Sequence, residues 1–273
     1  MFCECKALVN LNLTGWDTSK VEDMSHMFNR CNKLSNLDFL SDLDTSNVTD
    51  MYGMFEYCLL LKEFVTPITW DTSNVNNIGY MFYECIRLTK VDLSGLDTTN
   101  VNSISSMFNG CTRLKEVNLS NFNLSNVTSL SFMFNRCKSL VDVDLSGWNT
   151  SNIINMTYMF AGCESLVKLD LSHFNTYSVM DMSKMFKGCV RLKELDLSGW
   201  TSGSAKLKNM FDGCSSLKTL KLYTDDMFIR YRLEHRDMNE SLYENIQKFN
   251  PIDFEDDEDD IVNSDTVEDI TIP

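Results

Sequence analysis

Apolar residues recur along the chain in a fixed order, with a period of about 26 residues. Within one unit, "KEVNLS" alternates apolar and polar residues, which is typical of a short strand with one buried face. "NVTSLS" predicts a second short extended segment. "MFNRC" at 133–137 places apolar residues at i, i+1 and i+4, as on one helical turn. Most of the polar turns between these segments carry a Trp or Phe, which we expect to fill the interior of the coil.

The period is clearest in the cysteines, nine of which follow a Met-Phe pair or its equivalent at a constant offset: Cys5, Cys31, Cys58, Cys85, Cys111, Cys137, Cys163, Cys189 and Cys214. The intervals between them are 26, 27, 27, 26, 26, 26, 26 and 25 residues. A fixed period of this size indicates stacked repeats, because one unit cannot bury its apolar face alone. The sequence therefore predicts an α/β repeat solenoid over residues 1–223, with short parallel strands and one helical turn per repeat. We expect about nine coils, the first of them truncated.

Two runs, "LVDVDLSGWNTSNIINMTYMFAGCESL" and "LTKVDLSGLDTTNVNSISSMFNGCTRL", carry a resemblance to a known family. They resemble the BspA-like leucine-rich repeat of bacterial surface proteins. The resemblance implies a right-handed leucine-rich-repeat-type coil on a surface or secreted protein, often one used for adhesion or host-protein binding. It brings no catalytic residues. The N-terminus does not read as a signal peptide and no anchor is recognisable, so a surface location rests on the resemblance alone.

The repeat stops after "LKTLKLY". Residues 224–250 place Leu242, Ile246 and Phe249 at helical spacing, which predicts a helical cap over the last coil. Residues 251–273 contain ten acids and no Lys or Arg, and we expect them to form a disordered acidic tail. The tail carries most of the formal charge of −15. This acidic balance argues against nucleic acid as a partner, and no apolar run approaches the roughly 18 residues of a membrane span.

The cysteine ladder allows a disulfide reading as well as a packing reading. Stacked Cα atoms about 4.8 Å apart are within disulfide range, but their parallel Cβ vectors are poorly placed for a bond. We therefore expect free, buried thiols that pack as small hydrophobes. A ladder also spreads its sulfurs along an axis, whereas zinc needs about four converging ligands. With only three histidines and no Gly-rich phosphate loop, the sequence predicts a non-enzymatic protein without metal or cofactor.

The outward residues of the main strands form the candidate binding face. Its acids are Asp38, Glu63, Asp92, Glu116, Asp142, Asp144, Asp170, Glu194 and Asp196. One reading is a solvated sheet face. The functional reading is a mildly acidic surface that recognises a basic segment of another protein, such as a host or matrix protein. The chain would then be a protein-binding or adhesion module, and the alternative is a structural spacer within a larger repeat protein.

A second polar column heads the turns, with Asp17, Asp44, Asp71 and Asp97 followed in later repeats by Asn123, Asn149 and Asn175. We expect these side chains to accept N–H groups of their own turns. The accompanying Thr18, Thr45, Thr72 and Thr98 suggest an ice-binding ladder, but Leu124 interrupts that column.

Overall fold

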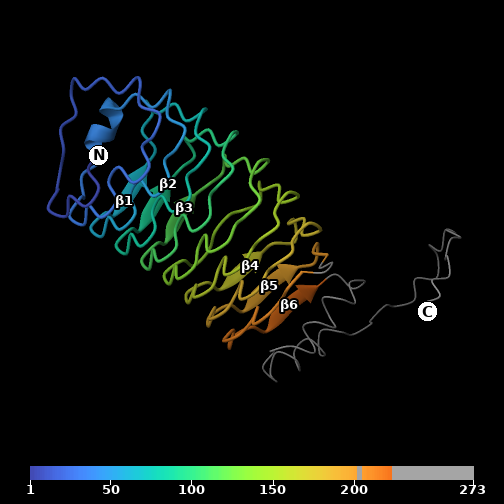
Figure 1. Ribbon diagram of the computed structural model, residues 1–273. Helices are drawn as coiled ribbons and strands as arrows, with labels where there is room; N and C mark the ends of the chain where they lie inside the picture. The colour runs from blue at the N-terminus through green and yellow to red at the C-terminus, as the bar shows by residue number, and fades with distance from the viewer. Residues whose placement is uncertain (202–204, 223–273) are drawn as a thin grey trace, which may run out of the picture.

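The computed structural model describes residues 1–201 and 205–222, which form a parallel β-solenoid (Figure 1). Successive coils stack along one axis from the N-terminus to β6. The named elements are the 3-10 helix η1 (Asp38–Asp42) and the strands β1 (Glu63–Val65), β2 (Lys90–Asp92), β3 (Glu116–Asn118), β4 (Lys168–Asp170), β5 (Glu194–Leu197) and β6 (Thr219–Leu222). The predicted solenoid is thus confirmed, and the predicted cap and acidic tail lie outside the described residues.

The strands pair in parallel, each with its equivalent in the next coil. They form two three-stranded sheets, β1-β2-β3 and β4-β5-β6. In β2 and β3, Val91 pairs with Val117, one repeat apart. A second ladder of isolated parallel bridges joins successive coils at positions such as Asn77 and Ser103, where the second extended segment was predicted. The register follows the repeat, so each column of the sequence becomes a row of neighbouring side chains.

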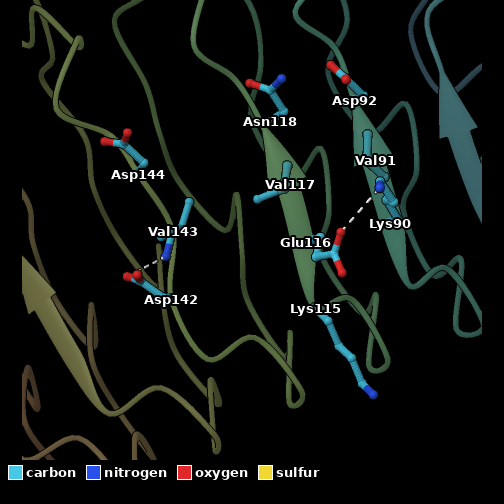
Figure 2. A pocket seen from close by; sticks show the side chains of 10 residues that line it. All are labelled: Lys90, Val91, Asp92, Lys115, Glu116, Val117, Asn118, Asp142, Val143 and Asp144. Carbon is cyan, nitrogen blue, oxygen red and sulfur yellow. Dashed lines mark hydrogen bonds and ion pairs between the residues drawn. The ribbon is translucent and has the colours of Figure 1, made fainter.

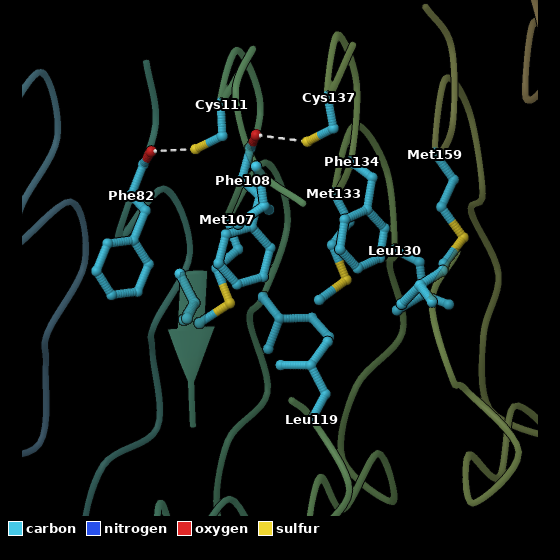
Figure 3. Packing of buried hydrophobic residues seen from close by; sticks show 14 of the residues in the cluster. Phe82, Met107, Phe108, Cys111, Leu119, Leu130, Met133, Phe134, Cys137 and Met159 are labelled. Atoms are coloured by element: carbon cyan, nitrogen blue, oxygen red, sulfur yellow. Dashed lines mark hydrogen bonds between the residues drawn. The ribbon is translucent and has the colours of Figure 1, made fainter. Parts of the chain in front are cut away.

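The core is organised around a stack of phenylalanine rings that continues from coil to coil, and Figure 3 shows three of them, Phe82, Phe108 and Phe134. Its members are Phe2, Phe28, Phe55, Phe82, Phe108, Phe134, Phe160, Phe186 and Phe211. Successive ring centroids are 5.5 to 5.9 Å apart and the rings are within 12° of parallel. Such stacked pairs contribute about 0.5–1.5 kcal/mol beyond the area that they bury. The Met-Phe pair is therefore the structural centre of the repeat.

The structure does not confirm the helical turn predicted at "MFNRC". In the described coils this segment forms consecutive turns, because alternate N–H groups have different acceptors. Met133 and Asn135 donate to carbonyls three residues back in their own coil, whereas Phe134 and Arg136 donate to the next coil. Two of these turns end at Met133 and at Cys137. Their third residues, Phe132 and Arg136, have positive φ, as a type II turn requires. Apolar spacing alone could not distinguish this arrangement from a helical turn.

Buried threonines connect the turns of successive coils by hydrogen bonds. The Oγ1 of Thr72 donates to the Asp97 carbonyl at 3.1 Å and accepts the Asp97 N–H at 2.8 Å. Thr18, Thr45 and Thr98 are also buried, so an ice-binding role on the surface is excluded for this column. The turn-heading acids accept N–H groups of their own turns, as predicted, with Asp44 accepting from Ser46 at 3.0 Å.

The aromatic plugs predicted in the turns are buried in most described coils. Trp70, Trp148, Trp200, Phe122 and Phe174 all lie in the interior. The first coil is the exception, because Trp16 remains 46% exposed.

Candidate functional site

Eight of the nine predicted acids lie along the strand side of the solenoid, at the places the repeat assigns to outward strand residues. Glu63 is in β1, Asp92 in β2, Glu116 in β3, Asp170 in β4, and both Glu194 and Asp196 in β5. Asp142 and Asp144 occupy the equivalent positions in the coil between β3 and β4.

Asp38 differs from this pattern and corrects the prediction of a strand there. It begins η1, in which Phe39 and Leu40 are both buried. Two consecutive buried side chains cannot alternate across a strand. The helix lies in the first of the two 27-residue intervals, between Cys31 and Cys58.

Lysines on the same face neutralise three of the acids. The parallel register places Lys90 beside Glu116, with Nζ 3.4 Å from a carboxylate oxygen. Lys168 and Glu194 are related in the same way at 3.5 Å. Lys221 donates to Asp196 at 2.8 Å. Such exposed pairs add little stability, but they reduce the charge available to a ligand.

Other acids of the face are held ionised by their own turns. The Ser94 hydroxyl and N–H, both within hydrogen-bond distance of Asp92 Oδ1, keep the pKa of that carboxyl below its usual range. Ser172 does the same to the pKa of Asp170. At Asp144, hydrogen bonding from the Ser146 N–H is the main cause of the lowered pKa. These carboxylates therefore stay charged well into the acidic range.

The sheet is interrupted in the middle of this face, at residues 140–146. There the Val143 N–H donates to Oδ1 of Asp142 at 2.8 Å (Figure 2). An Asp side chain that captures a neighbouring N–H competes with the strand ladder. The prediction of one strand per repeat does not hold in this coil, nor in the first coil, where residues 8–13 form no strand.

Two shallow hollows flank the interruption. One, of about 420 Å³, lies between the coils of β2, β3 and Asp142–Asp144, and has Val91, Val117 and Val143 in its lining. The other, of about 570 Å³, extends from Val143 and Leu145 toward Lys168, Asp170 and His173. Asp142, Val143 and Asp144 line both hollows.

The same coil carries a buried polar atom without a partner. The indole Nε1 of Trp70 donates to the Leu40 carbonyl at 2.9 Å, and that of Trp200 donates to the Leu171 carbonyl at 2.8 Å. In the described residues, Nε1 of Trp148 has no such acceptor. This coil thus lacks a hydrogen bond to the preceding coil that the coils of Trp70 and Trp200 both have.

The cysteine ladder is a hydrogen-bonded structure rather than a reactive site. Each buried thiol donates to the phenylalanine carbonyl of the preceding coil, as Cys137 does to Phe108 at 3.2 Å (Figure 3). The same carbonyl accepts the N–H of Cys111. Burial raises the pKa of the Cys137 thiol well above its usual value, which suppresses the nucleophilic thiolate. The sequence predicted the burial but not the acceptor.

Within residues 1–201 and 205–222, no group of three or more His, Cys, Asp or Glu side chains is arranged to hold a metal ion. The same part of the chain contains no helix long and apolar enough to cross a membrane.

Comparison with protein-family models gives a match to the family described as "Mycoplasma protein of unknown function, DUF285", over residues 1–119, 39–141 and 111–223. The chain belongs to this family. Together the three matches cover residues 1–223, the same part of the chain over which the cysteine period runs. A search of the curated proteins gave no match.

Solved structures similar to this DUF285 protein include bacterial leucine-rich-repeat proteins. A leucine-rich-repeat protein of T. pallidum is 21% identical, with a TM-score of 0.44, over 69% of this chain and 83% of the other. A leucine-rich cell-surface protein of Faecalibacterium prausnitzii is 16% identical, with a TM-score of 0.29, over 90% and 77%. A leucine-rich-repeat protein of Eubacterium ventriosum is 18% identical, with a TM-score of 0.38, over 68% and 54%.

Proposed function

We propose that this DUF285 protein is a non-enzymatic binding module of a cell-surface protein, and that its strand face recognises a basic segment of a partner protein. The observation that supports this most is the alignment of ionised carboxylates along one side of the solenoid. Extended faces of this kind are the surfaces with which repeat proteins bind. The cell-surface setting rests on the resemblance of the repeat sequence to BspA-like proteins.

The partner that fits this face is a basic segment of a protein, such as a host or matrix protein. Asp92, Asp144 and Asp170 are held by their own turns, so they present fixed negative charge. Fixed charges of one sign increase the association rate of an oppositely charged partner and select against acidic partners.

A structural spacer is the second candidate. The continuous phenylalanine stack and the thiol–carbonyl ladder both favour a stiff rod, which would hold other domains apart. A spacer needs no charged face, so the two candidates differ in what neutralisation of that face should do.

The experiment compares two variants that lose the same charge. In the first, Asp92→Asn, Asp142→Asn, Asp144→Asn and Asp170→Asn neutralise the strand face. In the second, Asp17→Asn, Asp44→Asn, Asp71→Asn and Asp97→Asn neutralise the turn column, where Asn123, Asn149 and Asn175 show that Asn supports the same turn. Binding to immobilised matrix proteins is measured by biolayer interferometry at physiological salt.

A binding module should lose affinity in the first variant and retain it in the second. Equal retention by both variants, or no specific binding by the parent protein to any basic protein tested, would favour the spacer. Circular dichroism of both variants confirms that the fold is intact before binding is compared.

A further inference from the structure

The central strand position is a valine in three successive coils, at Val91, Val117 and Val143, whereas β1 has Phe64 and β4 has Leu169 there. Val91 is buried almost completely, but Val117 is only partly buried and Val143 is 8% exposed. Valines of this position line the hollows on both sides of Val143, which therefore have an apolar floor.

Carboxylates of the same coil stand at the edge of this floor. Asp142 and Asp144 are exposed and line both hollows. Three lysines line the hollows, and two of them have other partners, since Lys90 pairs with Glu116 and Lys168 pairs with Glu194. The third, Lys115, directs its side chain away from Asp142 and Asp144 (Figure 2). In the part of the chain that the structure describes, no Lys or Arg forms an ion pair with Asp142 or Asp144.

An apolar floor edged by unpaired carboxylates is complementary to a long basic side chain. Lys and Arg lay their methylene stems on apolar surface and keep the charged head in a polar environment. The cation would meet Asp142 and Asp144 while the stem covers Val117 or Val143. An acidic surface alone would attract any cation, whereas this combination selects the length and polarity of the side chain.

We infer that the two hollows beside Asp142–Asp144 form one recognition slot, which takes two basic side chains from an extended segment of the partner protein. An extended segment that crosses the coils directs every second side chain toward the sheet, about 6.6 Å apart. Basic residues at i and i+2 would therefore enter the two hollows on either side of the Val143 coil. This inference rests on the proposed function and narrows it from the whole face to one coil.

The probe is the N-acetylated, C-amidated heptapeptide GSRSRSG, and its affinity for the full chain is measured by isothermal titration calorimetry. The variant Asp142→Asn/Asp144→Asn should bind at least tenfold more weakly. It should fold, because Asn118 already supports the equivalent turn by accepting from Ser120. The matched control Asp71→Asn/Asp97→Asn loses the same charge from the turn column, outside both hollows, and should change the affinity less than twofold.

A second variant tests the apolar floor without changing charge. Val143→Leu places at this position the residue found in β4 and β5, namely Leu169 and Leu195, so the fold should tolerate it. It should fill the hollows and weaken binding of GSRSRSG severalfold. The citrulline analogue of the peptide, which keeps the stem length without the charge, should bind neither the parent protein nor either variant.

Three results would overturn the slot. The first is no measurable binding of GSRSRSG to the parent protein. The second is an equal loss in the Asp142/Asp144 variant and in the control, which would show that only the overall charge of the protein matters. The third is unchanged binding by Val143→Leu. In the third case the acidic face would remain the binding surface, so failure of the slot is distinguishable from failure of the proposed function.

Discussion

Arg136 donates through Nη1 to Oε1 of Glu84 at 3.0 Å, although the two residues are 52 positions apart in the sequence. They belong to coils that are not adjacent, and the pair reaches across the coil between them at Gly110. A Cβ at Gly110 would lie 2.5 Å from the Glu84 carboxyl carbon. Glycine at this position is thus a condition of the ion pair, and φ of +81° there is a conformation that glycine adopts without strain.

Gly110→Ala should therefore destabilise the protein by about 2 kcal/mol, measured as the free energy of unfolding in urea. The left-handed conformation costs a residue with a Cβ about 1–2 kcal/mol. Displacement of Glu84 would also remove an ion pair that contributes up to about 1 kcal/mol. The control is Gly188→Ala, at φ +74° with its nearest neighbours 3.8 Å away. Equal losses in both variants would show that the Glu84–Arg136 pair contributes nothing.

Phe134→Ala should cost about 3–5 kcal/mol, as truncations of a buried Phe do. Phe134 is fully buried between Phe108 and Phe160, with ring centroids at 5.6 and 5.5 Å. The control Phe132→Ala changes a partly exposed ring two residues away, which stacks on Tyr158. Urea denaturation followed by fluorescence measures both. A loss well below 1 kcal/mol for Phe134→Ala would contradict the placement of the ring stack at the centre of the core.

Cys137→Ala should be tolerated far better than Cys137→Asp. Alanine leaves a small cavity, and the Phe108 carbonyl keeps the N–H of Cys111 as its other donor. Aspartate would bury a carboxylate beside that carbonyl oxygen, with no cation to compensate it.

Alkylation of the native protein followed by mass spectrometry tests the burial of the thiols, because Cys3 and Cys5 are exposed and should label first. Rapid native labelling of Cys111, Cys137 and Cys163 would disprove the packing role.

Stability should fall steeply at alkaline pH. Burial raises the pKa of the Cys31 thiol to about 11, and also raises the pKa values of Cys111, Cys137 and Cys163. Below pH 9.0, the pKa of a thiol in the unfolded chain, the thiol is protonated in both the folded and the unfolded state. Its contribution to the free energy of unfolding is then fully present. Above that pH only the unfolded state ionises, so each fully buried thiol removes about 1.4 kcal/mol per pH unit until the folded pKa is reached.

The measurement is the urea midpoint between pH 8 and pH 10. The triple variant Cys111→Ala/Cys137→Ala/Cys163→Ala begins with lower stability, but its midpoint should decline less with pH. Parallel pH dependences for the parent and the triple variant would refute the linkage to buried thiols.

The sequence by itself determined the repeat, its core and most of its outward face. Phe134 and Cys137 could be placed in the interior because their spacing recurs in coil after coil, and only stacking can bury a face that one coil leaves exposed. The same period put Glu63, Asp92 and Asp170 on the strand face. Periodicity is sufficient for these conclusions because it fixes which residues become neighbours.

Only the tertiary structure decided how those neighbours interact. The segment "MFNRC" has the apolar spacing of a helical turn, but alternate N–H groups find acceptors in the next coil, and turns form instead. The acceptor of each thiol is a carbonyl that no sequence pattern marks. At the interruption of the sheet, the Asp142 side chain accepts the Val143 N–H, and the Glu84–Arg136 pair depends on a missing Cβ at Gly110. In each case, polar groups compete for the same hydrogen-bond partner or atoms compete for the same space. The outcome depends on interatomic distances, which the period of a repeat does not specify.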